Sequence, residues 1–241
     1  AGALGGGVYG LCAAALKVRF GTNETLLTLM LNYIALYFLQ FFAETKAGWN
    51  FFLDPESARP KFAKFPASAQ MIAIPIGPFN LNLSLVIALA LCALIFIYLN
   101  YTKRGYEIAV VGDSPNTARY AGMRVGRIVL RTIFLSAALI GVAGAFHVSS
   151  AGVMSASPTN SVGWTGIVVA WLAKLNTVGI LVAAVLITVL QFGCQTASAT
   201  YPAIDANFAN LLQGVILFIV LAADFFTRFK LVRRGGKEAA K

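Results

Sequence analysis

Long apolar runs constrain this chain more than any other feature of its sequence. The run LVIALALCALIFIYL at residues 85–99 contains no charge and no alternation of polar and apolar residues. Crossing a bilayer takes about 20 helical residues, and every backbone N–H and C=O group inside the bilayer needs a partner within the protein. A transmembrane barrel strand would alternate in polarity, which this run does not. The sequence therefore predicts an all-α, polytopic integral membrane protein.

Similar apolar segments recur along the chain and are the predicted helices of a membrane bundle. Hydrophobic residues make up 59% of the chain and charged residues 12%, about half the share of charge in soluble globular proteins. The predicted helices are 1–16, 25–42, 81–101, 128–148, 163–173, 178–196 and 208–227. We interpret residues 1–227 as one transmembrane domain and residues 228–241 as a basic tail.

The distribution of Lys and Arg predicts the orientation of the chain. Cytoplasmic loops of membrane proteins collect these residues, and the longest basic polar stretch between two apolar runs is 102–127. With that stretch in the cytoplasm, the Lys and Arg residues left on the outer side, from a total of nineteen, are Lys46, Arg59, Lys61 and Lys64. The sequence thus predicts a cytoplasmic C-terminus. It also explains the net charge of +10 without a nucleic-acid partner.

Residues 44–80 form the predicted outer loop, which is rich in proline and in aromatic side chains. We favour interfacial anchoring for Trp49, Phe51 and Phe52, because aromatic rings collect at the boundary between membrane and water. The alternative is that the loop forms part of an outer mouth that receives a substrate-delivery protein.

One predicted helix is too short to cross a membrane. Segment 163–173 would reach about 16 Å, roughly half a bilayer, and a polar turn at 174–177 follows it. Such a helix is typical of a broken or re-entrant element that lines a cavity. An ordinary helix that extends outward through residues 161–162 fits the sequence equally well.

A second feature of the apolar segments concerns packing. In segment 128–148, the small residues Ala137, Gly141 and Ala145 recur every four positions and therefore share one helical face. Small side chains allow the backbones of two membrane helices to approach closely. The sequence predicts that another helix packs on this face.

The basic stretch 102–127 carries agreeing signals for a short helix. Ser114 or the aspartate before it can cap the helix, Pro115 suits its first position, and Gly122 suits the left-handed position after its end. The predicted helix is Pro115–Ala121, about 10 Å long and too short to be stable alone in water. A partner or the flanking chain must hold it, so we expect a docking element rather than a simple solvated loop.

Residues of this stretch also follow a pattern of Arg-Gly, Val-Gly, Pro, Ala and Gly. They are Arg104, Gly105, Val111, Gly112, Pro115, Ala118, Arg119, Ala121, Gly122 and Met123. The pattern resembles the cytoplasmic loop of ABC-importer permeases of the branched-chain amino acid, simple-sugar and nucleoside group. Segments 21–39, 163–180 and 211–221 resemble the same family, particularly its sugar and nucleoside branch, so the resemblance covers nearly the whole chain.

The resemblance implies a permease subunit in a bacterial or archaeal plasma membrane, with no catalytic residue and no metal site of its own. The sequence contains no G-x-x-x-x-G-K-[ST] phosphate loop. ATP and Mg would bind separate ATPase subunits, and a second permease subunit and an extracytoplasmic substrate-binding protein would complete the transporter. The residues expected to couple to the ATPase are Gly105, Gly112, Pro115, Ala118, Arg119, Tyr120, Ala121 and Gly122.

The family resemblance also bears on the start of the chain. Its members usually carry further membrane segments before the equivalent of Ala1, and this sequence opens with Ala1, Gly2 and Ala3 rather than with a Met. We therefore expect an N-terminal portion to be missing.

Polar side chains inside the apolar segments are the candidates for the substrate path, because such groups usually face a cavity or another helix. We select Asn32, Trp164, Thr165 and Gln191. An amide can bond a ribose hydroxyl or a base edge, and an indole can stack on a base or a sugar face. For each residue, a structural hydrogen bond or an interfacial position is the alternative.

The charge pattern favours a neutral substrate. An ion-coupled secondary transporter usually needs a carboxylate inside the membrane, and no carboxylate lies centrally in the predicted segments. A neutral substrate and an external energy source therefore fit better than an ion-coupled secondary transporter, which stays the alternative. A neutral substrate favours a nucleoside or a simple sugar over an amino acid. Branched-chain amino acids stay open as the alternative, since the ends of half-length helices could bind their carboxylates.

Overall fold

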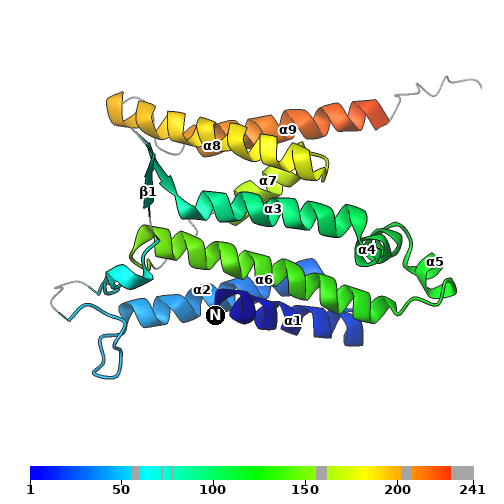
Figure 1. The fold of residues 1–241 in the computed structure, drawn as a ribbon, viewed down its shortest axis with the longest axis horizontal. Coiled ribbons are helices and arrows are strands. Elements are labelled where there is room, and N and C mark those ends of the chain that lie inside the picture. Colours follow the sequence, from blue (N-terminus) through cyan, green and yellow to red (C-terminus); the bar gives the residue numbers. More distant parts are fainter. Residues whose placement is uncertain (56–59, 72, 77–78, 156–161, 202–207, 229–241) are drawn as a thin grey trace, which may run out of the picture. The chain divides into compact units, whose positions relative to one another are not determined.

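The computed structural model describes residues 1–55, 60–71, 73–76, 79–155, 162–201 and 208–228 (Figure 1). These residues fall into two compact units, Ala1–Asn160 and Ser161–Lys241. The first unit contains α1 (Gly2–Phe20), α2 (Glu24–Glu44), η1 (Ala67–Ala69), β1 (Ala73–Ile76), β2 (Phe79–Asn82), α3 (Leu83–Tyr101), α4 (Lys103–Asp113), α5 (Pro115–Tyr120) and α6 (Val125–Ala151). The second unit contains α7 (Val162–Leu172), α8 (Thr177–Thr200) and α9 (Phe208–Arg228). The predicted all-α class is confirmed, with a short β-hairpin added in the outer loop.

Four of the described helices are long and apolar enough to cross a membrane, namely α2, α3, α6 and α8. Helix α7 and residues 208–223 of α9 are shorter apolar helices. The most apolar part of α3 contains no residue that is buried within the chain. Apolar surface of this extent is stable against lipid or other helices but not against water. The chain is therefore a multi-pass membrane protein.

Helices α1 and α6 lie side by side with almost nothing between their backbones (Figure 1). A Cβ added to Gly6 would lie 2.7 Å from the carbonyl oxygen of Ala137, and one added to Gly2 would lie 2.7 Å from that of Gly141. The predicted small-residue face of α6 is thus confirmed. Its partner is a matching repeat on α1 that the sequence analysis did not single out, formed by Gly2, Gly6 and Gly10.

The turn between α1 and α2 is fixed by local chemistry. Helix α1 ends at Gly21, whose φ of 65° is the left-handed conformation that favours glycine. Asn23 caps α2 by accepting a hydrogen bond from the Thr25 N–H at 3.0 Å. Lys17 near the end of α1 forms an ion pair with Glu24 at the start of α2. The two helices therefore begin and end within a few residues of the predicted bounds.

The outer loop contains the hairpin of β1 and β2, in which Ala73 pairs with Asn82 and Ile76 pairs with Phe79. The predicted start of the third helix at residue 81 is wrong, because the chain stays extended through Asn82 and α3 begins at the next residue. The Asn82 side chain donates a hydrogen bond to the Ser150 hydroxyl at 2.6 Å, which ties the hairpin to the end of α6.

The second unit confirms the half-length helix and the polar turn after it. Lys174 and Leu175 both adopt left-handed backbone conformations, with φ of 49° and 59°, and the Leu175 N–H donates to the Ala170 carbonyl at 3.0 Å. Asn176 then caps α8 by accepting a hydrogen bond from the Val178 N–H at 3.1 Å. Buried apolar residues hold α7 and α8 together in a small core of Val169, Ala183 and Ile187.

Candidate functional site

The basic stretch folds into two helices rather than one. Helix α5 is the predicted short helix: Pro115 occupies its first turn, and the Ser114 hydroxyl accepts a hydrogen bond from the Thr117 N–H at 3.3 Å. Gly122 follows with φ of 75°, as expected for a left-handed residue after a helix end. Helix α4 before it was not predicted. Its sequence signal is Thr102, which caps the first turn by accepting from the Gly105 N–H.

Helix α4 turns sharply away from the end of α3 and is pressed against it. Gly105 is buried, and a Cβ at this position would collide with the carbonyl oxygen of Leu99. The Thr102 hydroxyl donates to the Tyr98 carbonyl at 2.5 Å and so closes the same corner. The corner therefore requires glycine at position 105 for steric reasons, and it fixes the direction in which α4 leaves the span α3.

An ion pair joins α4 to the span α6. The Arg131 Nη2 of α6 lies 2.9 Å from the Glu107 Oε2 of α4, and both side chains are partly buried. The Arg131 Nε is buried and has no hydrogen-bond partner among the described residues. Neither residue was singled out from the sequence as a site residue, because a charged side chain near a helix end usually faces water. Helix α4 is thus held by two spans, α3 and α6.

The residues predicted to couple to an ATPase divide into an inner and an outer set. Gly105 and Ala118 are buried within the chain, and Ala118 is 0% exposed. The exposed members are Gly112, Pro115, Arg119, Tyr120, Ala121 and Gly122. Tyr120 is 93% exposed, more than any other large hydrophobic side chain among the described residues. The outer set is therefore accessible to a partner. The inner set, Gly105 and Ala118, packs within the chain and holds α4 and α5 in place.

Three polar side chains converge where α7, α8 and α9 meet in the second unit. The Thr165 hydroxyl donates to the Gln213 Oε1 at 3.4 Å and accepts from the Gln191 Nε2 at 3.5 Å. Gln213 is 5% exposed, and its Nε2 has no partner among the described residues. Gln191 lies about 21 Å along α8 from its first residue, which is well inside a bilayer core of about 30 Å. We name Thr165, Gln191 and Gln213 the amide cluster.

The structure brings two of the four predicted path residues together. Thr165 and Gln191 share the amide cluster, whereas the neighbouring Trp164 is 64% exposed. Asn32 lies on α2 in the first unit, and its side chain is exposed. Gln213 was missed, since its position in an apolar helix looked no different from that of other polar residues until the three helices were placed around it.

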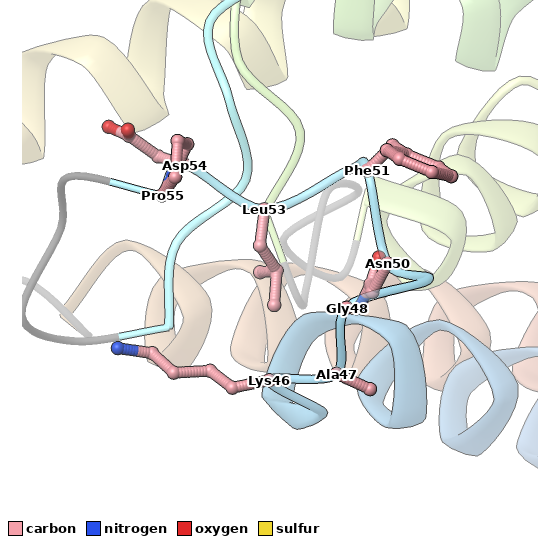
Figure 2. A pocket seen from close by; sticks show the side chains of 8 residues that line it. All are labelled: Lys46, Ala47, Gly48, Asn50, Phe51, Leu53, Asp54 and Pro55. Carbon is pink, nitrogen blue, oxygen red and sulfur yellow. The ribbon is translucent and has the colours of Figure 1, made fainter.

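The outer loop curls over the end of α2 and encloses an open hollow of about 450 Å³ (Figure 2). Asn50 is buried and donates hydrogen bonds to the carbonyls of Phe42 at 2.8 Å and Thr45 at 2.9 Å, which holds the loop in place.

The aromatic side chains of the loop differ in their contacts. Trp49 stacks near Phe41 with ring centroids 6.3 Å apart. Phe51 is 88% exposed, whereas Trp49 and Phe52 also contact rings of the chain itself. The rings of Trp49 and Phe52 therefore anchor the loop to the end of α2, and Phe51 stays a predicted interfacial anchor.

Across the described residues, no three His, Cys, Asp or Glu side chains come together in a group that could hold a metal ion. The described residues instead offer the exposed helix α5, the ion pair between α4 and α6, and the uncharged amide cluster.

The class of protein that these features define is a polytopic membrane protein. Its apolar spans are joined by a half-length helix and by a short capped helix. Residues 1–221 match the family described as "Branched-chain amino acid transport system / permease component", and the chain belongs to this family.

Curated relatives are similar to the chain at low identity. The chain is 29% identical to the nucleoside ABC transporter permease protein NupB of Lactococcus lactis subsp. cremoris, over 89% of this chain and 60% of NupB. It is 27% identical to the guanosine ABC transporter permease protein NupP of Bacillus subtilis, over 97% of this chain and 67% of NupP. It is 25% identical to the glucose ABC transporter permease protein TsgB13 of Haloferax volcanii, over 90% of this chain and 58% of TsgB13. No solved structure matches the chain.

Proposed function

We propose that this chain is a membrane-spanning subunit of an ATP-driven ABC importer, which forms the path for a neutral nucleoside or simple sugar and couples to separate ATPase subunits. Family membership supports the general class, and the names of the relatives NupB, NupP and TsgB13 support the substrate class. The observation that carries the proposal is helix α5, an exposed and capped helix that stands at the end of the two spans α3 and α6.

The outer face of α5 is the proposed ATPase contact. Arg119 and Tyr120 are exposed side chains of the type that anchors protein interfaces, where Tyr and Arg contribute most of the binding energy. Gly112, Pro115, Ala121 and Gly122 lie in the same exposed surface and allow a partner backbone to approach. Gly105 and Ala118 have the different role of fixing α4 and α5 against the spans. ATP and Mg would bind in the ATPase subunits, so this chain itself would catalyse no reaction.

The amide cluster is the proposed centre of the substrate path. Residues 162–201 and 208–223 carry one charged side chain, Lys174, which lies in the turn between α7 and α8. An uncharged cluster of amides and a hydroxyl can hydrogen-bond to sugar hydroxyls and base edges, which are neutral. Trp164 and Asn32 stay predicted path residues whose exposed side chains are available to substrate or to a second subunit.

The remaining parts of the proposal follow from the importer class. A second permease subunit would complete the path, and an extracytoplasmic substrate-binding protein would dock at the outer loop 44–80. The protein would lie in a bacterial or archaeal plasma membrane with its C-terminus in the cytoplasm, as the distribution of Lys and Arg predicts.

Branched-chain amino acids are the second candidate substrate class, favoured by the description of the family itself. Thr165 lies in the first turn of α7, and the N-terminal turn of a helix attracts a carboxylate. The absence of a charged side chain from the amide cluster makes this candidate the weaker one, because a zwitterionic substrate also needs a partner for its ammonium group.

The test is ATP-dependent uptake of labelled adenosine by the complete transporter, with excess unlabelled inosine, ribose or leucine as competitor. We expect inosine to suppress uptake and leucine to leave it unchanged. Suppression by ribose as well would move the substrate class to simple sugars, and suppression by leucine would favour the amino-acid candidate. Uptake that persists without ATP or without the ATPase subunits would overturn the importer class.

A further inference from the structure

The ion pair between Glu107 and Arg131 joins the helices on either side of α5. Glu107 belongs to α4, which leads directly into α5, and Arg131 belongs to α6, which follows α5 after a short turn. The two residues are far apart along the chain, yet their side chains meet at 2.9 Å. The pair therefore links the two ends of the segment 107–131, and this segment contains the exposed helix α5.

The location of Arg131 makes the pair more than a surface contact. Arg131 lies about 9 Å from the first residue of α6, one of the four helices that can span a membrane. A charged side chain near the end of a span lies close to the boundary between membrane and water, where pairing lowers the cost of shielding it from water. Both partners are partly shielded from solvent, so their attraction is screened less than that of an exposed pair.

The other end of α4 is held by shape rather than by charge. Gly105 lies against the backbone of Leu99, and the Thr102 hydroxyl bonds the Tyr98 carbonyl, so α4 cannot pivot freely about the end of α3. At its far end, α4 meets α5 through Ser114, which caps α5 and ends α4. A displacement of α5 therefore reaches α6 along two routes, the short turn at residues 121–124 and the ion pair.

These two routes differ in stiffness. The turn contains Gly122 in a left-handed conformation, with no side chain of its own to pack. The buried side chain of Ala118 and the hydrogen bond from the Met123 N–H to the Ala118 carbonyl at 3.0 Å hold the turn against α5 rather than against the span. The ion pair is a polar side-chain contact that reaches α6 itself, in addition to the packing of α4 and α5 against α6.

We infer that Glu107 and Arg131 are the joint through which helix α4 transmits movement of α5 to the span α6, an inference that rests on the proposed ABC-importer function. Glu107 and Arg131 act as positioning residues, since neither touches the substrate or the nucleotide. The guanidinium uses Nη2 for Glu107 and leaves the buried Nε without a partner among the described residues, so it can change its partners as α4 moves. Loss of the pair disconnects ATP hydrolysis from transport while α5 still binds the ATPase.

The experiment measures substrate transported per ATP hydrolysed by the complete transporter in liposomes. The variants are Glu107→Gln, Arg131→Gln and the charge-reversed double variant E107R/R131E. We expect each single variant to lower the ratio at least about fivefold, the lower end of typical coupling between sites, and the double variant to restore most of it. The matched control is Glu24→Gln, which removes the ion pair of Glu24 with Lys17 between α1 and α2 and should leave the ratio unchanged.

The outcomes separate this inference from the proposed function. Failure of the unmodified transporter to show ATP-dependent uptake would reject the importer itself. A wild-type ratio in both single variants would reject the joint while leaving the importer intact. Folding is monitored by the amount of assembled complex and by basal ATP hydrolysis, which the inference expects to stay within about twofold of wild type because neither residue lies on the exposed face of α5. A double variant that assembles normally but stays uncoupled would also overturn the inference.

Discussion

At the scale of single residues, Gln213 is the most informative side chain of the second unit. A buried amide group without a full set of partners costs about 1–3 kcal/mol, and a leucine of similar size would avoid this cost. Rotating the amide does not remove the cost, because the exchange of Oε1 and Nε2 would leave the oxygen unpaired instead. A glutamine at this position is therefore easier to explain by a ligand than by packing.

The first prediction concerns Gln213→Leu. We expect the free energy of unfolding to stay the same or to rise by about 1 kcal/mol, since an unpaired amide is replaced by an apolar side chain. Substrate binding should weaken by about fivefold, which corresponds to one lost hydrogen bond of about 1 kcal/mol. Uptake kinetics and thermal unfolding of the purified transporter measure the two effects. The control is Gln195→Leu, which changes an exposed glutamine of α8; equal effects at both positions would argue against the amide cluster.

The second prediction concerns Tyr120→Ala on α5. An aromatic side chain that is 93% exposed in the chain can be buried in a partner, and such anchors contribute about 2 kcal/mol or more to an interface. We expect the affinity for the ATPase subunit to fall about 30-fold. Binding of purified ATPase to the permease in detergent measures the change. Tyr33→Ala on the span α2 serves as the comparison, and a loss of affinity there as large as at Tyr120 would place the contact elsewhere.

At the scale of elements, the sequence predicts helices well where apolar runs and caps agree. Helices α5, α7 and α9 begin at or within one residue of the predicted starts, because Ser114 and the change from polar to apolar sequence mark them clearly. Helix α4 was not predicted, because Gly105, Gly112 and several β-branched residues lower the helix propensity of this segment. The contact with α3 that stabilises α4 is tertiary and is not visible in the sequence. The partner of the small-residue face on α6 escaped for the same reason: periodicity identifies a face, but not the helix that covers it.

The third prediction tests the contact between α1 and α6. Gly6→Val should disrupt it, because a Cβ at this position lies 2.7 Å from the Ala137 carbonyl and the backbone cannot move aside. Overpacking of this kind costs about 1–3 kcal/mol, which thermal unfolding in detergent would detect as a lower midpoint. Gly5→Val is the control, since no atom lies within 4 Å of a Cβ there. Equal midpoints for the two variants would contradict the close approach of the helices.

At the scale of the whole molecule, the sequence predicts the class of protein from its apolar runs and the orientation from its charges. The four long apolar helices bear out the class. The amide cluster could be predicted only in part, because Thr165 and Gln191 are visible as polar residues in apolar runs, whereas the convergence of three helices is not encoded in any single run. The basic tail predicted at 228–241 lies, apart from Arg228 at the end of α9, outside the described residues.

The fourth prediction concerns the orientation of the chain. In a background without Cys12, Cys92 and Cys194, single cysteines are introduced as Tyr120→Cys and Phe51→Cys, both at highly exposed positions. A membrane-impermeant maleimide should label the Phe51→Cys variant in intact cells and the Tyr120→Cys variant only after permeabilisation, as the excess of Lys and Arg on one side requires. The reverse pattern of labelling would show that the predicted orientation is wrong. Helix α5 would then lie on the outer side of the membrane, where ATP is not available.

The left-handed turn between α7 and α8 has a practical consequence for handling the protein. Leu175 lies in a backbone conformation that costs an ordinary residue about 1–2 kcal/mol, and its side chain is exposed. Leu175→Gly should release about 1 kcal/mol of this strain, which corresponds to a rise of about 2–4 °C in the melting temperature for a chain of this size. Differential scanning fluorimetry in detergent would show the rise, and an unchanged or lower midpoint would contradict it. The turn thus gives a starting point for a variant that survives purification longer.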